Sequence, residues 1–255
     1  MKSFLILILL FTFAFSKEPD QLTELDIDIS KFEIASKTDQ IMLVIPSNYS
    51  TSIATFYFYL KKENKWNQRF ETRAHIGKNG LGKEKEGDLK TPVGVFKFNR
   101  YFGIEENPGT NLPYVKVNES HYWDGDSKSK NYNTLVNKET YTDFNTSLSE
   151  HIIDYKPGYE YAMNINYNEE QTPYKGSAIF LHCFTNNNYS HGCVAIDKDI
   201  LKSIYQEINK DCHIIIDTKE NMTKYYHNGS DIPSDNASNF INFGILMIIC
   251  LVLSL

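Results

Sequence analysis

The chain lacks the residue patterns of several common function classes. Lysine and arginine total 26 against 32 aspartates and glutamates, the formal net charge is −6, and no dense basic cluster occurs. Proteins that bind nucleic acid usually carry a basic patch, so nucleic acid is not an expected partner. The sequence also has no paired-cysteine zinc pattern, no phosphate-binding glycine loop and no internal repeat. These absences exclude a zinc-binding module, a P-loop nucleotide-binding protein and a repeat protein.

Two neighbouring segments carry residues that can build a nucleophilic site. An apolar run at 179–181 reads as a buried strand that ends at His182, and Cys193 follows eleven residues later. The loop between them is polar and turn-prone, so it can fold back and bring the thiol beside the imidazole. An adjacent imidazole can take the thiol proton and give a reactive thiolate. Gly192 lets the backbone approach a reacting carbonyl, where nearby N–H groups can stabilise an oxyanion.

At these residues the sequence resembles the catalytic domain of the L,D-transpeptidases, cysteine enzymes of the bacterial cell wall. The family signature is a histidine, a spacer, and Ser/Thr-His/Ala-Gly-Cys followed by apolar residues, which correspond here to His182 and the run 190–196. The resemblance reaches from about Thr38 to Asp217. Its other blocks are 77–82, 86–88, 90–96, 101–103, 123–124, Ser129, 132–133 and 176–182.

The resemblance implies a role for each residue of the motif. Cys193 is the expected nucleophile and His182 the base that activates it, with the backbone carbonyl of Cys183 orienting the imidazole. The amides of Gly192 and Cys193 are the expected oxyanion donors. An inert buried thiol and a core histidine are the alternatives for Cys193 and His182.

Five residues are expected to contact the substrate: Ser190, His191, Trp123, Tyr132 and Asn133. Ser190 and His191 belong to the motif and also shape its loop. His191 is not the expected base, because its position is alanine in parts of the resembled family. The other three lie in a region that faces the donor substrate in that family, and Trp123 and Tyr132 offer flat apolar faces. A solvated loop histidine is the alternative for His191, and local loop packing is the alternative for the other three.

Hydrophobic patterning predicts a mainly β, sandwich-like domain of mixed sheets with one or two helices, in agreement with the resembled family. The clearest helix is capped by Asp197, and the segment 103–140 is a long turn-rich region that is functional or contains small elements of its own. The run 83–86 alternates in charge and reads as a solvated loop. Strands are expected at 41–45, 53–60, 73–76, 93–98, 161–167, 178–182 and 213–216.

Both ends of the chain read as targeting signals rather than as parts of the fold. Residues 1–16 have a basic start, an apolar run and a small-x-small cleavage site, which is typical of a signal peptide. An acidic, poorly patterned lead-in (17–37) precedes the expected catalytic domain (38–218). A polar spacer (219–239) and an uncharged hydrophobic tail (240–255) follow it.

The tail predicts attachment to a membrane. Three small residues at 228–230, the polar spacer and the terminal apolar run form the pattern of a glycolipid (GPI) attachment signal. A membrane helix is the alternative, but the run is short for a bilayer and lacks flanking basic residues. These signals predict a eukaryotic secretory route to the cell surface, with the protein membrane-anchored on the extracellular side. Glycosylation sequons support this route and occur at Asn48, Asn118, Asn145, Asn188, Asn221, Asn228 and Asn236.

The motif and the resemblance favour an acyl-transfer enzyme. Cys193 would attack the carbonyl after an L-residue in a peptidoglycan stem peptide or muropeptide and release the terminal D-residue. An amine would resolve the thioester in a transpeptidase, and water in an L,D-carboxypeptidase, and neither a metal nor an organic cofactor is needed. A surface binding module that keeps the fold without turnover is the alternative. A papain-type protease is disfavoured because the histidine precedes the cysteine.

The remaining cysteines and one sequon give two further expectations. Without the tail and its Cys250, three cysteines remain, and one bonded pair beside a free nucleophile is the simplest arrangement in an oxidising compartment. We therefore predict a Cys183–Cys212 disulfide. The sequon at Asn188 lies five residues before Cys193, where a glycan would crowd the groove, so we predict that Asn188 is unmodified in active protein.

Overall fold

The computed structural model describes residues 25–227, which contain twelve strands, one α-helix and several short 3-10 helices. The mostly β composition with few helices confirms the predicted fold class. The predicted signal peptide (1–16) and hydrophobic tail (240–255) lie outside the described residues and remain predictions. Within residues 25–227, no helix has the length and apolar character needed to cross a bilayer.

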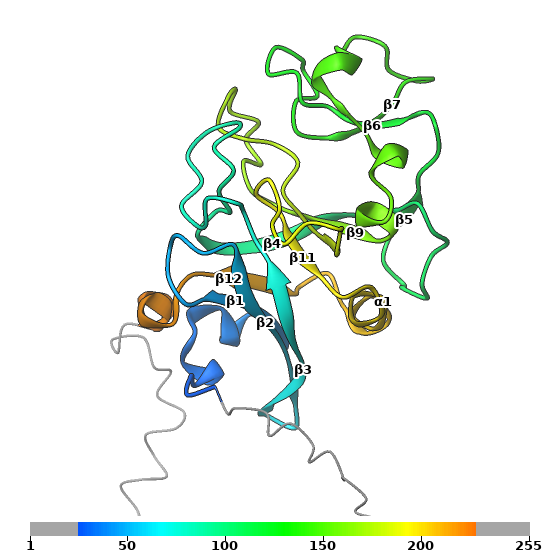
Figure 1. Cartoon of the computed structure of the whole chain (residues 1–255). Helices are drawn as coiled ribbons and strands as arrows, with labels where there is room; N and C mark the ends of the chain where they lie inside the picture. The colour runs from blue at the N-terminus through cyan, green and yellow to red at the C-terminus, as the bar shows by residue number, and fades with distance from the viewer. Residues whose placement is uncertain (1–24, 228–255) are drawn as a thin grey trace, which may run out of the picture.

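Nine strands form one mixed sheet in the order β12-β1-β2-β3-β11-β10-β9-β4-β5. β12 also pairs with β4, so the sheet returns on itself and forms a closed circuit (Figure 1). The pairs β1–β12, β4–β5 and β10–β11 are parallel, and the other pairs are antiparallel. The strands are β1 (Gln40–Pro46), β2 (Ile53–Lys62), β3 (Lys65–His75), β4 (Gly94–Gly103), β5 (Tyr114–Lys116), β9 (Ala162–Ile165), β10 (Phe180–Cys183), β11 (Val194–Ile196) and β12 (His213–Ile216).

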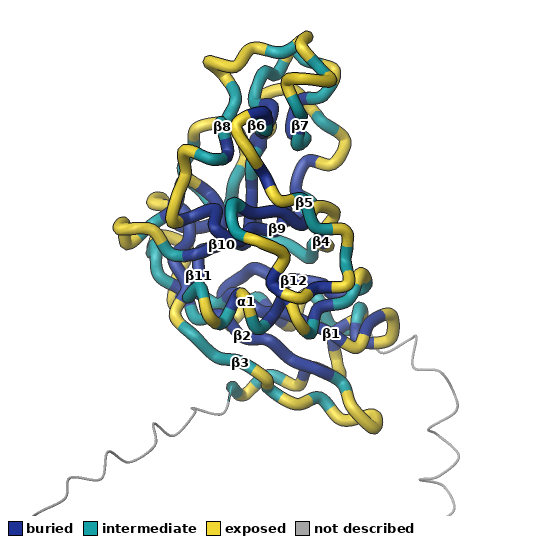
Figure 2. Tube along the Cα trace, turned by 90° about the vertical axis from the view of Figure 1, so that its right-hand side faces the viewer, coloured by how far each residue is buried: buried dark blue, intermediate teal, exposed yellow. Residues whose placement is uncertain are grey.

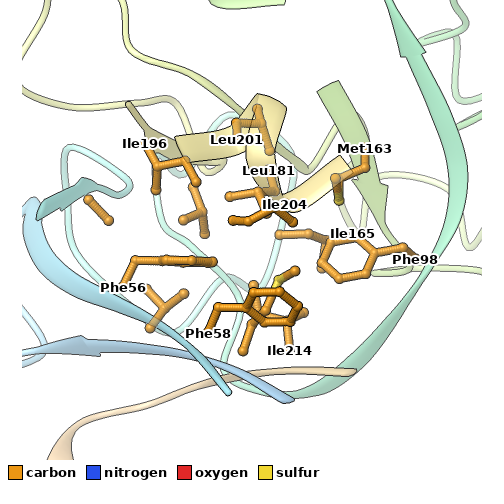
Figure 3. Close-up of a cluster of buried hydrophobic side chains, with 14 of the residues drawn as sticks. Phe56, Phe58, Phe98, Met163, Ile165, Leu181, Ile196, Leu201, Ile204 and Ile214 are labelled. Atoms are coloured by element: carbon orange, nitrogen blue, oxygen red, sulfur yellow. The ribbon is translucent and has the colours of Figure 1, made fainter. Parts of the chain in front are cut away.

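The inner face of this sheet encloses the main core. Alternate residues of β1 and β2 point inward, and Met42, Val44, Phe56 and Phe58 are fully buried there. Removing such apolar side chains from water is the main favourable contribution to the stability of the fold. The labelled side chains in Figure 3 converge from several strands and from the helix: Phe56, Phe58, Phe98, Met163, Ile165, Leu181, Ile196, Leu201, Ile204 and Ile214.

The α-helix α1 (Lys198–Glu207) follows β11 after a single residue, Asp197. The Asp197 carboxylate accepts hydrogen bonds from the N–H groups of Asp199 (2.9 Å) and Ile200 (3.1 Å), which confirms the predicted cap. The apolar side of α1 packs into the main core, so the helix fixes the C-terminal end of β11. Its buried residues are Leu201, Ile204 and Tyr205.

The outer face of β1, β2 and β12 is apolar too, and both ends of the described chain cover it. The covering elements are η1 (Ile29–Lys31), η2 (Glu33–Ser36) and η6 (Lys219–Tyr225), and Phe32 forms a bridge with Tyr226. Residues 25–37 and 219–226 are thus packed parts of the domain rather than the predicted loose lead-in and polar spacer. The physical reason is that apolar residues on this outer face need cover. The covering elements bury Ile29, Phe32, Ala35 and Met222.

A second sheet, with three strands in the order β7-β6-β8, lies between β5 and β9 in the sequence. In Figure 1, β6 and β7 lie away from β1, β2 and β3, and in Figure 2 the loops around them are largely exposed. Much of this sheet comes from 103–140, which therefore contains small elements of its own, as predicted. Within 103–140 these elements include β6 (His121–Trp123) and β7 (Leu135–Asn137), and η3 (Thr146–Leu148), β8 (Glu150–His151), η4 (Ile152–Tyr155) and η5 (Gly158–Glu160) follow them in the chain.

All three cysteines among residues 25–227 are free thiols. Cys183 ends β10 and its Sγ lies 3.7 Å from the carbonyl oxygen of Tyr161, whereas Cys212 lies before β12 with its Sγ 3.8 Å from the carbonyl oxygen of His213. Two strands, β9 and β4, separate β10 from β12 in the sheet. The predicted Cys183–Cys212 disulfide is therefore wrong, because the two strand ends are not neighbours.

Candidate active site

Strands β10 and β11 place His182 and Cys193 on one face of the sheet. The strands are parallel, with Leu181 opposite Val194 and His182 opposite Ala195. Leu181 and Val194 point into the main core. His182 follows Leu181 and Cys193 precedes Val194, so both side chains point to the opposite face, because successive residues of a strand alternate between faces. The loop between the two segments therefore folds back and brings them together, as the sequence predicts.

The Cys193 thiol is buried and is held by two backbone groups. Its Sγ accepts a hydrogen bond from the Phe180 N–H (3.3 Å) and donates one to the carbonyl oxygen of Ala178 (3.2 Å). Burial raises the pKa of the Cys193 thiol to about 12, and the Glu150 carboxylate adds to this increase. The Phe180 N–H and the Lys83 ammonium act in the opposite direction. Cys193 is thus a neutral thiol in the structure.

The imidazole of His182 is oriented as a base. Its Nδ1 lies 2.7 Å from the carbonyl oxygen of Cys183, which can only accept, so Nδ1 carries the proton and Nε2 has the free lone pair. The ring packs edge-on against Tyr159, with 5.3 Å between the ring centroids. Burial lowers the pKa of His182 to about 4, against smaller effects of the Cys183 and Gly158 backbones. His182 is therefore neutral at neutral pH, and its predicted contact with the Cys183 carbonyl is confirmed.

The structure does not contain the thiolate beside a protonated imidazole that the sequence suggests. Cys193 directs its proton to Ala178, and no hydrogen bond joins Sγ to His182 within residues 25–227. Both side chains are neutral because both are desolvated. A transfer of the proton to Nε2 would thus have to occur during a reaction.

The hydroxyl groups of Ser190 and Thr91 fix the loop that precedes the nucleophile. Ser190 Oγ donates to the carbonyl oxygen of Cys193 (2.6 Å) and accepts from the Gly192 N–H (3.1 Å). Thr91 Oγ1 donates to the same carbonyl (3.3 Å) and accepts from the Gly77 N–H (2.8 Å). Ser190 therefore shapes the loop, as predicted, and its hydroxyl hydrogen is used within the loop rather than directed at a substrate.

Gly192 occupies a position that no other residue fits. Its φ is +142°, and a Cβ atom there would lie 2.9 Å from the carbonyl oxygen of Lys90 and 3.0 Å from Ile179 Cδ1. The Gly192 N–H is bonded to Ser190 Oγ, so as an oxyanion donor it would have to exchange this bond for one to the substrate. These contacts explain why a glycine stands here, and the approach to a reacting carbonyl stays a prediction.

A cavity of about 480 Å³ opens over this site, and both Cys193 and His182 line it. Its size suits a short peptide segment. Among residues 25–227, no cluster of three or more histidine, cysteine, aspartate or glutamate side chains is arranged to hold a metal ion. The other lining residues are Lys83, Glu86, Gly87, Leu89, Trp123, Gly125, Leu148, Glu150, Tyr155, Gly158, Tyr159, Ser177, Ala178, Thr185, Asn187, Tyr189, Ser190 and His191.

His191 and Trp123 both line the cavity, but they differ in accessibility. His191 is exposed, and its ring stacks on Tyr189 with 6.2 Å between the centroids. It is therefore free to meet either substrate or solvent. Trp123 is only 2% exposed, packs against Phe102 and Phe180, and belongs to the cluster under the small sheet. Packing is its main role in the structure.

Tyr132 and Asn133, which the sequence places at the substrate, do not line the cavity. The Tyr132 hydroxyl donates to Glu86 (2.6 Å), and the side chain is 1% exposed. The Asn133 amide donates to the carbonyl oxygens of Tyr167 (3.0 Å) and Asn168 (3.1 Å). Local packing, the alternative given above, therefore describes both residues, because their polar groups are already bonded within the protein.

Glu150 and Tyr159 are cavity residues that no motif indicates. Glu150 belongs to β8 and Tyr159 to η5, and the Tyr159 hydroxyl donates to Glu150 Oε2 (2.8 Å). Burial raises the pKa of Glu150 to about 7, although the Tyr159 hydrogen bond acts against this shift and Glu86 adds to it. Only the fold brings Glu150 to the cavity, so the sequence alone carries no signal for it.

Lys83 is a further cavity residue that sequence reasoning missed, since 83–86 reads as a solvated loop. Its side chain is 3% exposed and forms an ion pair with Asp88 at 2.9 Å. Asp88 also accepts backbone N–H groups of Glu84, Lys85 and Lys90, which with Lys83 lower its pKa to about 2 against the opposing effect of burial. The loop is thus a structured wall of the cavity.

Comparison with known proteins gives one family and several distant structures. The chain matches the model of the YkuD family, the L,D-transpeptidase catalytic domain, over residues 50–216. No protein of curated function is detectably similar in sequence.

Among solved structures, the helical cell shape determining protein Pgp2 from Campylobacter jejuni is 18% identical, with 72% of this chain and 52% of that chain covered and a TM-score of 0.37. Bd1075 from Bdellovibrio bacteriovorus is 17% identical, with 73% and 50% covered and a TM-score of 0.37. The L,D-transpeptidase (Yku) from Stackebrandtia nassauensis is 15% identical, with 75% and 61% covered and a TM-score of 0.34. The chain thus spans about half the length of the first two.

The assignment of the family depends on the sequence match and not on these distant structures. The matched residues cover more than half of the chain and include His182, Cys193 and the loop between them. The chain therefore belongs to the L,D-transpeptidase catalytic domain family, a family of peptidoglycan-related transpeptidases.

Proposed function

We propose that the protein is a cysteine acyltransferase that acts on peptidoglycan-type stem peptides through a thioester at Cys193. The observation that supports this most strongly is the placement of a buried thiol and a neutral, oriented imidazole in one cavity. Cys193 and His182 both line it, and the Nδ1 contact with Cys183 leaves Nε2 free as a base. Membership of the L,D-transpeptidase catalytic domain family supports the substrate class.

In the proposed reaction, Sγ of Cys193 attacks the carbonyl carbon between an L-residue and a terminal D-residue. His182 Nε2 takes the thiol proton and then gives it to the amine of the leaving D-residue, so that a C–S bond replaces the C–N bond. The N–H groups of Cys193 and Gly192 would stabilise the intermediate oxyanion. An amine or water then resolves the thioester and restores the thiol.

One observation favours the alternative of a binding module without turnover. The Cys193 pKa of about 12 and the hydrogen bond to Ala178 describe a thiol that is not activated in the structure. The intact loop favours the enzyme, because Ser190 and Thr91 both hold the carbonyl of Cys193, a precision that binding alone does not need.

We also propose that the protein travels through the secretory pathway and is held at the cell surface by a GPI anchor. The sequence features at 1–16 and 228–255 support this proposal. Release from intact cells by a phosphatidylinositol-specific phospholipase is the expected result. Retention in the membrane after complete digestion of a GPI-anchored control would contradict it.

The thioester is tested by quenching turnover with acid and weighing the intact protein. A stem tetrapeptide should add the mass of its tripeptide acyl portion, and neutral hydroxylamine should remove that mass because it cleaves thioesters. The matched control is Cys193→Ser, in which an adduct would survive as a hydroxylamine-resistant ester or not form. Absence of any adduct at Cys193 during confirmed turnover would exclude the proposed intermediate.

A further inference from the structure

Two carboxylates of the cavity, Glu150 and Glu86, form no ion pair within residues 25–227, and of these two only Glu150 has an oxygen without a hydrogen bond. Glu150 lies in the small sheet, on an element distinct from those that carry Cys193 and His182, yet all three line the same cavity. Glu150 Oε2 accepts the Tyr159 hydroxyl at 2.8 Å, while Oε1 has no hydrogen bond to any residue within 25–227. The ring of Tyr159 in turn packs edge-on against His182. Tyr159 thus contacts the carboxylate through its hydroxyl and the base through its ring.

The other charges of the cavity leave Glu150 as its available anion. Lys83 is neutralised by Asp88 at 2.9 Å, and His182 is uncharged at neutral pH. Glu86 carries a second negative charge, but its two oxygens accept the hydroxyl groups of Tyr132 (2.6 Å) and Ser177 (2.9 Å). Glu150 is half-buried, and a carboxylate that is partly desolvated and faces a cavity without a counter-ion points to a functional rather than a structural role.

We propose that Glu150 binds the ammonium group of the acceptor, and that the cavity therefore prefers a primary amine to water as the group that resolves the thioester. The acceptor class is a peptide with a primary amine on a side chain, such as a diamino acid in a second stem. This inference rests on the proposed function, because it assigns the second half of that reaction to a named residue. Tyr159 is the positioning residue that holds Oε2.

The proton balance of the step is complete without a further reactant. The bound ammonium gives one proton to the Glu150 carboxylate, and the neutral amine attacks the thioester carbonyl carbon to form a C–N bond. The adduct then loses a second proton to His182 Nε2, and the C–S bond breaks. His182 returns that proton to Cys193 Sγ, and Glu150 releases its proton to solvent.

The pKa of Glu150 suits a group that takes a proton from the acceptor ammonium and releases it again. A carboxyl with a pKa of about 7 both accepts a proton from an ammonium group and releases it again near neutral pH, which an ordinary glutamate does poorly. Desolvation raises the pKa of Glu150 and the Glu86 carboxylate adds to this increase, whereas the hydrogen bond from the Tyr159 hydroxyl favours the ionised form.

The first test measures how the thioester partitions between aminolysis by the acceptor and hydrolysis by water. The full protein is given a stem tetrapeptide as donor and Nα-acetyl-L-lysine amide as acceptor, and the ratio of aminolysis to hydrolysis is measured. Glu150→Gln keeps the size of the side chain and should lower this ratio about tenfold by raising KM for the amine, the effect of one lost charge-assisted contact. The control, Glu170→Gln, makes the same exchange at an exposed carboxylate that does not line the cavity and should leave the ratio within about twofold. Equal ratios in wild type and Glu150→Gln, or equal losses in both variants, would overturn the inference.

The second test does not depend on turnover. Amide chemical shifts of the protein are followed while Nα-acetyl-L-lysine amide or its norleucine analogue, which lacks the amine, is added. The lysine probe should shift the amides of residues 149–159, and Glu150→Gln should weaken this binding about tenfold while Glu170→Gln does not. Equal binding of both probes would refute the inference even if the enzyme turns over. Glu150-dependent amine binding in a protein without turnover would refute the proposed function alone.

Discussion

The thiol of Cys193 donates its hydrogen to the carbonyl oxygen of Ala178, with 3.2 Å between sulfur and oxygen. Ala178 has a φ of 55°, a left-handed conformation that is uncommon outside glycine. Its N–H donates to Asn133 Oδ1 (3.0 Å), which also accepts the indole N–H of Trp123 (3.0 Å). Asn133 therefore holds the backbone group that receives the thiol proton, although the sequence suggested that it meets the substrate.

Asn133→Ala should destabilise the protein by about 2–3 kcal/mol, because it leaves buried donors at Trp123 and Ala178 without an acceptor. It should also slow acylation of Cys193, since Ala178 is no longer held in its left-handed conformation. Urea unfolding and the rate of adduct formation check both effects. Asn67→Ala, at an exposed asparagine whose side chain bonds only to Lys65, is the control and should change stability by less than about 0.5 kcal/mol. Equal stability of the two variants would contradict the role of Asn133.

The reactivity of Cys193 should rise with pH over the whole neutral range. A thiol with a pKa of about 12 is protonated at pH 7, and only its thiolate reacts with iodoacetamide. The alkylation rate should therefore increase roughly tenfold per pH unit from about pH 6 to 9, with peptide mapping to identify the modified residue. A thiolate–imidazolium pair predicts a constant rate over this range instead. A plateau would thus show that His182 holds the proton before substrate binds.

Gly192→Ala should destabilise the protein by more than about 3 kcal/mol or prevent folding, because it combines a left-handed backbone with a close contact to the carbonyl oxygen of Lys90. Gly82→Ala is the matched control. Gly82 also has a positive φ (+86°), but a Cβ atom there meets nothing within 4 Å. Its cost should be limited to about 1–2 kcal/mol of backbone strain. Thermal unfolding of both variants measures the difference, and similar losses would show that the space around Gly192 is not limiting.

Acid should weaken the fold partly through His182. Its pKa is about 4 in the fold and 6.5 when unperturbed, so the unfolded chain binds protons first as the pH falls between these values. The free energy of unfolding should then decrease through this window, by up to roughly 3 kcal/mol from His182 alone. Burial lowers the pKa of His75 and of His213 as well, so both act in the same direction. Urea unfolding at pH 7.5 and pH 5.0 should show a smaller loss for His182→Gln than for wild type. The same loss in both would mean that His182 is not buried as a neutral group.

Much of the fold follows from local patterns, and the exceptions have a common cause. Short apolar runs located β1 and β12, alternating residues located β2, and the Asp197 cap located α1. β3 was expected at 73–76 but begins at Lys65, because its polar first half forms a strand only through pairing with β2. The packing of 25–37 was missed for a similar reason. Its few apolar residues become informative only once the outer face of the sheet is known.

The same distinction applies to the candidate site, where some residues could be predicted from the sequence and others only from the fold. Cys193, His182 and Gly192 lie in one short stretch, where residue type and spacing indicate their chemistry. Glu150 and Lys83 reach the cavity from separate segments, so only the tertiary fold shows their proximity. Of the three residues expected to contact substrate from the long turn-rich region, Trp123 lines the cavity, whereas Tyr132 and Asn133 do not. An aromatic or amide side chain suits core packing and ligand contact equally well, so the sequence could not separate the two roles.

The products formed from a stem tetrapeptide test the central claim most directly. Purified protein is incubated with tetrapeptide-bearing muropeptides, and the products are identified by mass spectrometry beside Cys193→Ala. We expect loss of the terminal D-residue, or a new cross-link between two stems, with wild type and neither with the variant. Unchanged muropeptides with wild type, or the same products with Cys193→Ala, would contradict an acyl transfer through Cys193.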